Sequence, residues 1–308
     1  MKVVVAGGTG FLGRALARSL AADGHDVVGL TRSPQPRDGG RATSQRPFRL
    51  ATWTPAEGQG PWIAELDGAA ALVNLAGESI AAKRWTAAHK QRILESRVHA
   101  TRTMAAAIRS VSNPPPVFVS ASAVGYYGPR GDEVVVEETP AGSDFLAGVC
   151  VQWETEAARA AGDRTRIVCI RTGLPLERDG GALPPLVPPF WLGAGGPMGS
   201  GRQYWPWIHR DDWVALVRWA IDTPAATGPL NATAPTPVTN RDFARALGRA
   251  MHRPAIVPAP AFALRLILGE MADALVLSGQ RAVPAKAERL GFTFRYRTLD
   301  DALGAIFG

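Results

Sequence analysis

Three glycines near the start of the chain have the spacing of a phosphate-binding turn. They follow the apolar run 3–6 and open the segment 11–22, whose apolar residues recur at helical spacing. Glycine lets backbone N–H groups approach a phosphate, and the N-terminus of a helix adds positive potential. A position between a predicted strand and a predicted helix favours a dinucleotide pyrophosphate site over a purely structural turn. The expected contacts are Gly7, Thr9, Gly10, Phe11, Leu12 and Gly13.

The end of the second predicted strand, 26–30, indicates which dinucleotide is bound. An acidic side chain at this place would accept a hydrogen bond from the 2′-hydroxyl of NAD. The chain instead continues with Thr31 and Arg32. A guanidinium group can bind a phosphate with two parallel hydrogen bonds. The sequence therefore predicts NADP(H) as the cofactor, with Thr31 and Arg32 among its contacts.

Other polar residues could take part in chemistry at the same end of the strands. Glu78 follows the predicted strand 70–75 and is expected to face the cleft, where it would contact a substrate. Tyr126 and Tyr127 could donate a proton, although the sequence shows no partner that would shift the pKa of either hydroxyl. Asp211 and Asp212 open a predicted helix, and we expect them to cap it.

The elements that position these residues alternate between strand and helix over the first half of the chain. Further strands are predicted at 116–120 and 166–171, and helices at about 94–108 and 142–161. This order is typical of an α/β fold with a Rossmann-like, doubly wound parallel sheet. After residue 174 the rhythm changes to a loop at 177–206, a helix at 211–222, a short strand near 229–231, a helix at 240–251 and a mostly helical tail.

We therefore predict an NADP-binding domain over 1–174, its sheet completed by later segments. A smaller, mostly helical C-terminal lobe, 175–308, would bind the substrate. The stretch 180–201 is uncharged, but its 7 Gly and 5 Pro favour a loop over a membrane span.

Composition and charge limit the classes of molecule that the chain is expected to bind. The net charge is +7, and 30 of the 34 basic residues are Arg, scattered along the chain without a basic run. We therefore expect neither a nucleic-acid nor a membrane partner. Cys150 and Cys169 have no metal-ligand spacing, which predicts no metal and reduced thiols in a cytoplasmic protein. The substrate and the oligomeric state stay open.

Motifs along nearly the whole chain resemble one protein family. The chain is similar to the atypical extended short-chain dehydrogenase/reductases, and within them to the branch called "epimerase family proteins", also labelled nucleoside-diphosphate-sugar epimerase-like or cell-division-inhibitor-like. The resemblance lies in GGTGFLG at 7–13, LTR at 30–32, NLAGESI at 74–80, SRV at 96–98, SASAVGYYG at 120–128, WE at 153–154, RTG at 171–173, GSGRQ at 199–203 and WIHRDD at 207–212. The segments ALRLILGEMA at 263–272 and SGQR at 278–281 resemble the branch's own C-terminal extension.

The resemblance implies further cofactor contacts. Leu75, Ala76 and Gly77, which follow the strand ending near Asn74, would border the ribose. Arg97 lies on the helix that passes the cofactor, and Pro175 would lie near the nicotinamide.

The chain departs from this superfamily at the residues that carry out catalysis. Active members of the superfamily use a Ser with a Tyr-x-x-x-Lys pair, whose Lys lowers the Tyr pKa from about 10. Ser122 stands where the Ser is expected, but Phe145 and Val149 occupy the places of Tyr and Lys. We take Ser122 and Tyr127 as catalytic candidates and Tyr126 as a substrate contact. Arg202 resembles the arginine with which sugar-nucleotide epimerases bind a diphosphate.

Two functions stay open at this point. One is an NADP-dependent oxidoreductase or epimerase with atypical acid/base residues, acting on a sugar-nucleotide-like substrate. The other is an NADP(H)-binding sensor or interaction protein with little turnover.

Overall fold

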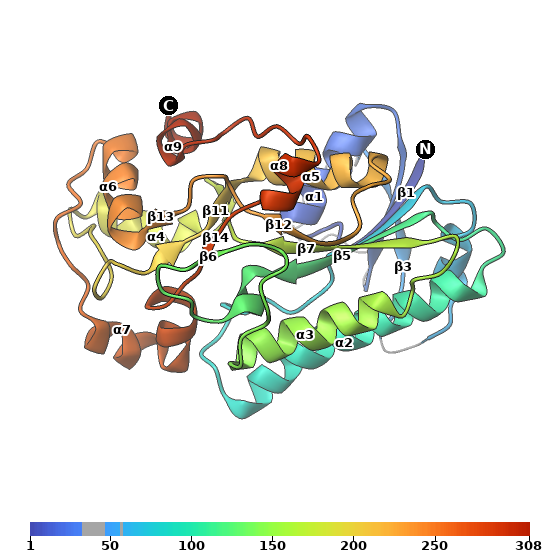
Figure 1. Ribbon diagram of the computed structural model, residues 1–308, viewed down its shortest axis with the longest axis horizontal. Coiled ribbons are helices and arrows are strands. Elements are labelled where there is room, and N and C mark those ends of the chain that lie inside the picture. Colours follow the sequence, from blue (N-terminus) through green and yellow to red (C-terminus); the bar gives the residue numbers. More distant parts are fainter. Residues whose placement is uncertain (33–46, 56–57) are drawn as a thin grey trace, which may run out of the picture.

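The structure, a computed structural model, describes residues 1–32, 47–55 and 58–308, and its centre is a seven-stranded sheet (Figure 1). Every pairing in this sheet is parallel. The Rossmann-like α/β fold predicted from the sequence is confirmed. From one edge to the other the strands are β12 (Gly228–Ala232), β7 (Arg166–Thr172), β5 (Val117–Ala123), β4 (Ala71–Asn74), β1 (Lys2–Ala6), β2 (Asp26–Thr31) and β3 (Arg49–Thr52).

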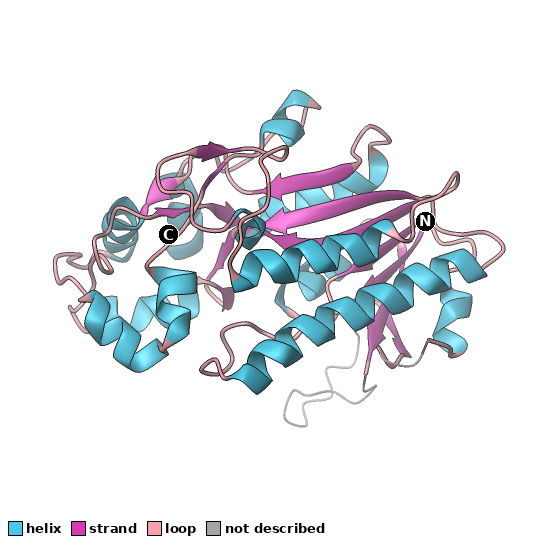
Figure 2. Ribbon diagram, turned by 60° about the horizontal axis from the view of Figure 1, so that its bottom comes forward, coloured by secondary structure: helices cyan, strands magenta, loops and turns pink. Residues whose placement is uncertain are grey.

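Helices cover both faces of the sheet, which is why its central strands are apolar on both sides. The long helices α2 (Ala87–Ser110) and α3 (Phe145–Ala158) pack together on one face, as Figure 2 shows, over a core that includes Val4, Met104 and Phe118. On the opposite face α1 (Phe11–Ala22) packs against α5 (Arg210–Asp222), over a core that includes Val5, Leu16 and Trp213.

A second group of elements forms a smaller lobe around its own core, which includes Trp207, Phe243 and Leu303. It contains two small sheets, one of β11 (Trp207–His209), β8 (Leu174–Glu177) and β9 (Gly180–Gly181), the other of β10 (Tyr204–Trp205) and β13 (Val238–Thr239). Its helices are α4 (Leu183–Trp191), α6 (Asn240–Met251), α7 (Ala261–Leu268) and α9 (Leu299–Phe307).

Short elements connect these parts. They are the 3-10 helices Pro61–Glu65 and Val124–Tyr127, the π-helix Ala272–Val276, the strand pair β6 (Val134–Val135) and β14 (Arg281–Ala282), and α8 (Ala285–Arg289). After β7 the chain returns to the large sheet twice. It first adds α5 and β12, and later places Ala287, Phe292 and Phe294 in the core of the α1 face.

The predicted loop at 177–206 is wrong in part, because α4 lies inside it. Two of its prolines stand in the first turn, where a missing N–H costs no hydrogen bond. Pro188 and Pro189 lie further along, yet Leu183 and Phe190 are buried in the lobe core. Burial of these side chains outweighs the poor helix propensity of proline.

The predicted cap of α5 is also corrected. The side chain of His209, not that of an aspartate, accepts a hydrogen bond from the N–H of Asp211, with 3.1 Å between N and Nδ1. Asp212 is buried and accepts hydrogen bonds from the N–H groups of Arg295 and Tyr296, both at 2.9 Å. Asp212 therefore fixes the tail of the chain against α5.

Among the described residues no helix is long and apolar enough to cross a bilayer. No cluster of three or more His, Cys, Asp or Glu side chains in the described part of the chain could hold a metal ion.

Candidate functional site

The site lies where the direction of strand order reverses in the large sheet. From β1 the order runs to β2 and β3 on one side, and to β4, β5 and β7 on the other. In open α/β sheets ligands bind at this switch point, beyond the carboxyl ends of the strands. The glycine turn follows β1, and Leu75, Ala76 and Gly77 follow β4. The sheet therefore brings together two segments that were predicted separately as cofactor contacts.

The three glycines of the turn have different roles. Gly7 has φ +76°, and a Cβ there would lie 2.8 Å from the carbonyl oxygen of Leu75. A Cβ on Gly13 would lie 2.2 Å from the carbonyl oxygen of Gly7, so this glycine lets α1 pack on the turn. Among the described residues other than its chain neighbours, a Cβ on Gly10 would meet only one atom within 4 Å, the Gly7 oxygen at 3.2 Å. Gly10, at the N-cap of α1, therefore faces the open space that a pyrophosphate would need.

The lobe contacts the turn through Phe11. A Cβ on Gly180 would lie 2.2 Å from the Phe11 ring, so this ring lies flush against β9. The preceding strand contains Pro175, whose carbonyl accepts a hydrogen bond from Ala182 at 2.9 Å. A Cβ on Gly181 would meet both the Pro175 carbonyl oxygen and the Phe11 ring, so Pro175 lies near the glycine turn, and its contact with the nicotinamide stays a prediction.

Arg32 follows the last residue of β2 and is exposed. Thr31 precedes it, half-buried, and pairs with Thr52 of β3. Within the described residues no carboxylate forms an ion pair with Arg32. Its guanidinium is accordingly available to an anion at the β2 side of the switch point.

Arg97 of α2 lies on the other side of the switch point. Its Nη1 donates to the carbonyl oxygens of Glu78 (2.9 Å) and Ile93 (3.0 Å), and its guanidinium carbon lies 5.1 Å from the ring centroid of Trp153. Burial lowers the pKa of Arg97. Among the described residues no carboxylate lies within ion-pair distance of it. A half-buried cation without a counter-charge, beside Gly77, suits an anionic ligand.

Glu78 does not point freely into the cleft. Its Oε1 lies 3.3 Å from Nδ1 of His89 and 3.5 Å from Nε of Arg92, both on the first turns of α2. Its backbone N–H donates to Ser96 at 3.0 Å. The predicted contact between Glu78 and a substrate stays a prediction.

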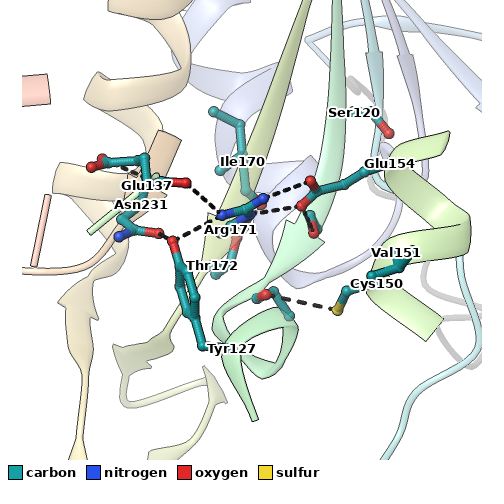
Figure 3. A network of polar contacts seen from close by, with 12 residues as sticks. Ser120, Tyr127, Glu137, Cys150, Val151, Glu154, Ile170, Arg171, Thr172 and Asn231 are labelled. Atoms are coloured by element: carbon teal, nitrogen blue, oxygen red, sulfur yellow. Dashed lines mark hydrogen bonds and ion pairs between the residues drawn. The ribbon is translucent and has the colours of Figure 1, made fainter. Parts of the chain in front are cut away.

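A polar network that includes Glu154, Arg171 and Tyr127 lies at the carboxyl ends of β5 and β7 (Figure 3), and Ser122 belongs to it through Glu154. The Ser122 hydroxyl donates to Oε1 of Glu154 at 2.7 Å. Arg171 binds both oxygens of the same carboxylate, through Nε and Nη2, each at 2.8 Å. Burial opposes the charge on Arg171, but its hydrogen bonds with Glu154 and Tyr127 raise its pKa above the usual value. The carboxylate of Glu154 thus holds the serine and the arginine together.

Tyr127 lies on the inner side of this network and is fully buried. Its hydroxyl donates to Oδ1 of Asn231 at 2.6 Å and accepts from Nη1 of Arg171 at 3.0 Å. Burial raises the Tyr127 pKa to about 12. Both hydrogen-bonding positions are used inside the protein, which favours a structural role over proton transfer to a substrate. Arg171 and Asn231 are thus the hydrogen-bonding partners of Tyr127 that the sequence did not reveal.

Glu137 completes the network from the loop after β6. Its carboxylate accepts hydrogen bonds from the N–H groups of Asn231 and Lys286, both at 3.1 Å, and its carbonyl accepts from Arg171 at 3.0 Å. Burial raises the pKa of Glu137. Sequence reasoning missed Glu137, Glu154, Arg171 and Asn231 as a group. The available signal was the WE and RTG motifs, which contain Glu154 and Arg171.

Two further candidates are Tyr126 and Arg202. The ring of Tyr126 is half-buried and stacks on Arg171, with 3.4 Å between ring centroid and guanidinium carbon. Arg202 is exposed in the turn after Gly201. Phe145 opens α3 and packs edge-to-face on Trp85, with 5.3 Å between ring centroids.

A lysine does lie near Phe145 in space. Nζ of Lys90, on α2, is 4.9 Å from the Phe145 ring centroid and 2.7 Å from Glu270 of the C-terminal tail. Along the sequence Lys90 does not have the spacing of a Tyr-x-x-x-Lys pair with Phe145. With a phenyl ring in place of a phenol, however, the lysine has no hydroxyl to activate.

The parallel sheet, the glycine turn at its switch point and the appended lobe define a Rossmann-like protein of the dehydrogenase and epimerase class. The chain belongs to the NAD dependent epimerase/dehydratase family, whose model matches residues 3–232. Residues 259–306 match a second model, described as a domain of unknown function, DUF1731. The resemblance inferred from the motifs is thereby confirmed.

Three relatives show how far the similarity extends. The "Epimerase family protein SDR39U1 homolog, chloroplastic" of Arabidopsis thaliana is 41% identical, over 99% of this chain and 86% of its own length. The crystal structure of the human epimerase family protein SDR39U1 with NADPH has a TM-score of 0.88, with 35% identity and 99% of both chains covered. That of the nucleoside-diphosphate sugar epimerase from Corynebacterium glutamicum has a TM-score of 0.77, with 36% identity over 100% of this chain and 58% of that one.

Proposed function

We propose that the chain binds NADP(H) across the β1/β4 switch point. The observation that carries this proposal is the glycine turn, whose Gly10 faces open space between two strand ends, with Arg32 at the end of the neighbouring β2. The pyrophosphate would lie on the N–H groups at the start of α1. Arg32 would bind the 2′-phosphate. The human relative crystallised with NADPH supports the choice of cofactor.

The nicotinamide half would lie on the β4 and β5 side. There Leu75, Ala76, Gly77 and Arg97 border the strand ends, and Pro175 approaches from the lobe. When bound, NADPH supplies a hydride. The chain's own residues would hold the cofactor, and the lobe would shield it from water.

Calorimetry with NADPH and NADH tests the cofactor assignment. We expect NADPH to bind more tightly, because Arg32 can pair with a 2′-phosphate that NADH lacks. The Arg32→Ala change should weaken NADPH binding about tenfold or more and leave NADH binding nearly unchanged. Arg18, exposed on α1, gives the matched control, and Arg18→Ala should bind NADPH like the parent protein. Equal affinities of the parent for the two cofactors would rule out the assignment.

For turnover we propose a slow oxidoreductase or epimerase, acting on a substrate similar to a sugar nucleotide. Ser122 stands at the end of β5, and the related C. glutamicum protein is named as a nucleoside-diphosphate sugar epimerase. Slow turnover is expected because Phe145 and Val149 cannot transfer a proton and Tyr127 is buried. General acid/base catalysis is worth roughly 10²–10⁴-fold in rate.

A cofactor-binding sensor with no turnover is the second candidate, favoured by the same buried tyrosine. A screen of carbonyl compounds and sugar nucleotides against the NADPH-loaded protein separates the two. Oxidation of NADPH, or a changed sugar found by product analysis, identifies an enzyme. Unchanged NADPH and unchanged compounds throughout, with NADPH bound, identify the sensor.

A further inference from the structure

The lobe carries a concentration of exposed apolar side chains that the cofactor site does not explain. Of the ten large hydrophobic side chains exposed among the described residues, seven lie in three segments of this lobe. Their exposed fractions range from 44% to 84%. We call them the apolar patch: Trp191, Leu192, Ile256, Val257, Phe262, Leu266 and Ile267.

Two of these segments lie side by side, and the third follows directly along the chain. The N–H of Val257 donates to the carbonyl of Gly195 at 3.0 Å, and the N–H of Ala259 donates to Pro197 at 2.8 Å. The loop after α4 therefore runs beside the chain that leads into α7. That helix reads AFALRLIL and has no buried residue. Figure 1 shows α4, α6 and α7 together at the end of the molecule away from the N-terminus.

Positive charge borders the apolar patch on the side of Trp191 and Ile256. A hollow of about 560 Å³ adjoins it, and its lining includes Arg245, Arg249, His252, Arg253 and Ile256. The guanidinium carbon of Arg253 lies 4.9 Å from the ring centroid of Trp191, which joins the hollow to the patch.

The balance of charges stays positive after the ion pairs are counted. Segments 180–204 and 241–268 contain six arginines and one acidic residue, Asp242. Two acidic residues from outside, Asp273 and Asp300, pair with Arg265 and Arg249. Six arginines against three carboxylates leave a net charge of +3, nearly half of the chain's +7.

We propose that this surface docks on an anionic lipid bilayer. The exposed Trp, Phe, Leu and Ile side chains would enter the boundary between headgroups and acyl chains, while the arginines of the hollow bind lipid phosphates. A second copy of the chain fits less well, because a two-fold interface would place the same positive charge on both sides. This proposal does not depend on cofactor binding, and it departs from the expectation that the chain has no membrane partner.

Co-sedimentation of the full chain with vesicles tests the proposal. One set of vesicles is phosphatidylcholine, and the other is phosphatidylcholine mixed with phosphatidylglycerol. We expect binding to the anionic vesicles, at least about tenfold weaker binding to the neutral ones, and release as salt is raised.

Three variants separate the contributions. The double change Phe262→Ser/Leu266→Ser should weaken binding to the anionic vesicles about tenfold or more, because it removes two large apolar side chains. Arg245→Ala/Arg253→Ala should reduce anionic binding toward the neutral level. Val151, exposed on α3, gives the matched control, and Val151→Ser should bind like the parent. Circular dichroism and the unfolding midpoint establish that each variant is folded.

Several results would overturn the proposal. The parent chain stays in the supernatant with anionic vesicles, or the Phe262→Ser/Leu266→Ser protein binds them as well as the parent does. A third contradicting result is that sedimentation velocity shows a dimer of the parent chain. This dimer would not bind vesicles, and the double change would dissociate it. In that case the apolar patch is a contact between copies.

Discussion

At the scale of residues, Glu154 is the centre of the polar network. It accepts a hydrogen bond from Ser122 and two from Arg171, whose side chain is almost entirely buried. Removing one partner of a buried ion pair leaves an uncompensated charge, which costs more than the pair itself contributes.

We therefore predict that Glu154→Gln lowers the free energy of unfolding by about 3–5 kcal/mol, because it leaves Arg171 without a counter-charge. Urea unfolding of parent and variant measures this. Glu138→Gln is the control, since Glu138 pairs with Arg289 on the surface and both side chains are well exposed. That change should leave stability close to the parent value. Equal effects of the two changes would mean that the network does not stabilise the fold.

Motifs mark Glu154 and Arg171, but which residues pair with each other could not be predicted, because the partners are far apart along the sequence. Ser122 and Glu154 are separated by 32 residues, and Tyr127 and Asn231 by 104. Only the fold brings them together, at the ends of β5, β7 and β12. The position of Arg97 on a helix was easier to predict, because the SRV motif at 96–98 lies within a long segment of helical period.

At the scale of elements, the glycine turn could be predicted because its signals are local. An apolar strand, a spaced glycine motif and a helical period occur within 22 residues. Helix α4 could not be predicted, because its prolines disfavour a helix. Only the burial of Leu183 and Phe190 in the lobe core stabilises it. Strand β3 lies at the sheet edge and has no buried residue, so its apolar signal is weak.

The turn gives a prediction that separates ligand binding from folding. Gly10→Val should abolish NADPH binding with little loss of stability, because the added side chain would occupy the space where the pyrophosphate approaches. Gly13→Val should destabilise the protein, since its Cβ would overlap the carbonyl of Gly7. Calorimetry and thermal unfolding of both variants provide the comparison. If Gly10→Val retains parental affinity, the pyrophosphate lies elsewhere.

At the scale of the whole molecule, three buried groups link stability to alkaline pH. Burial raises the pKa of Cys150 to about 11, and those of Cys169 and Tyr127 to about 12. Their usual values are 9.0 for the thiols and 10.0 for the phenol. The unfolded chain therefore loses these protons first, and stability is lost as pH rises.

We predict that these three groups do not change the free energy of unfolding below pH 9. Above pH 9 they should lower it. The slope should be about 1.4 kcal/mol per pH unit for each group that is ionised only in the unfolded chain. Urea unfolding across this range measures the slope. Cys150→Ala should make the fall shallower between pH 9 and about 11. A slope that this change leaves untouched would show that the thiol ionises alike in both states.

The hydrogen bond from Ser122 to Glu154 has a consequence for recognition. A serine hydroxyl has one hydrogen, and an ion-paired carboxylate takes it here. Toward any ligand at the end of β5, Ser122 thus offers only lone pairs. It would accept a hydrogen bond from an alcohol or an amide N–H and would repel a carbonyl oxygen. We therefore expect this serine to favour ligands that donate a hydrogen bond, because Glu154 holds its own hydrogen.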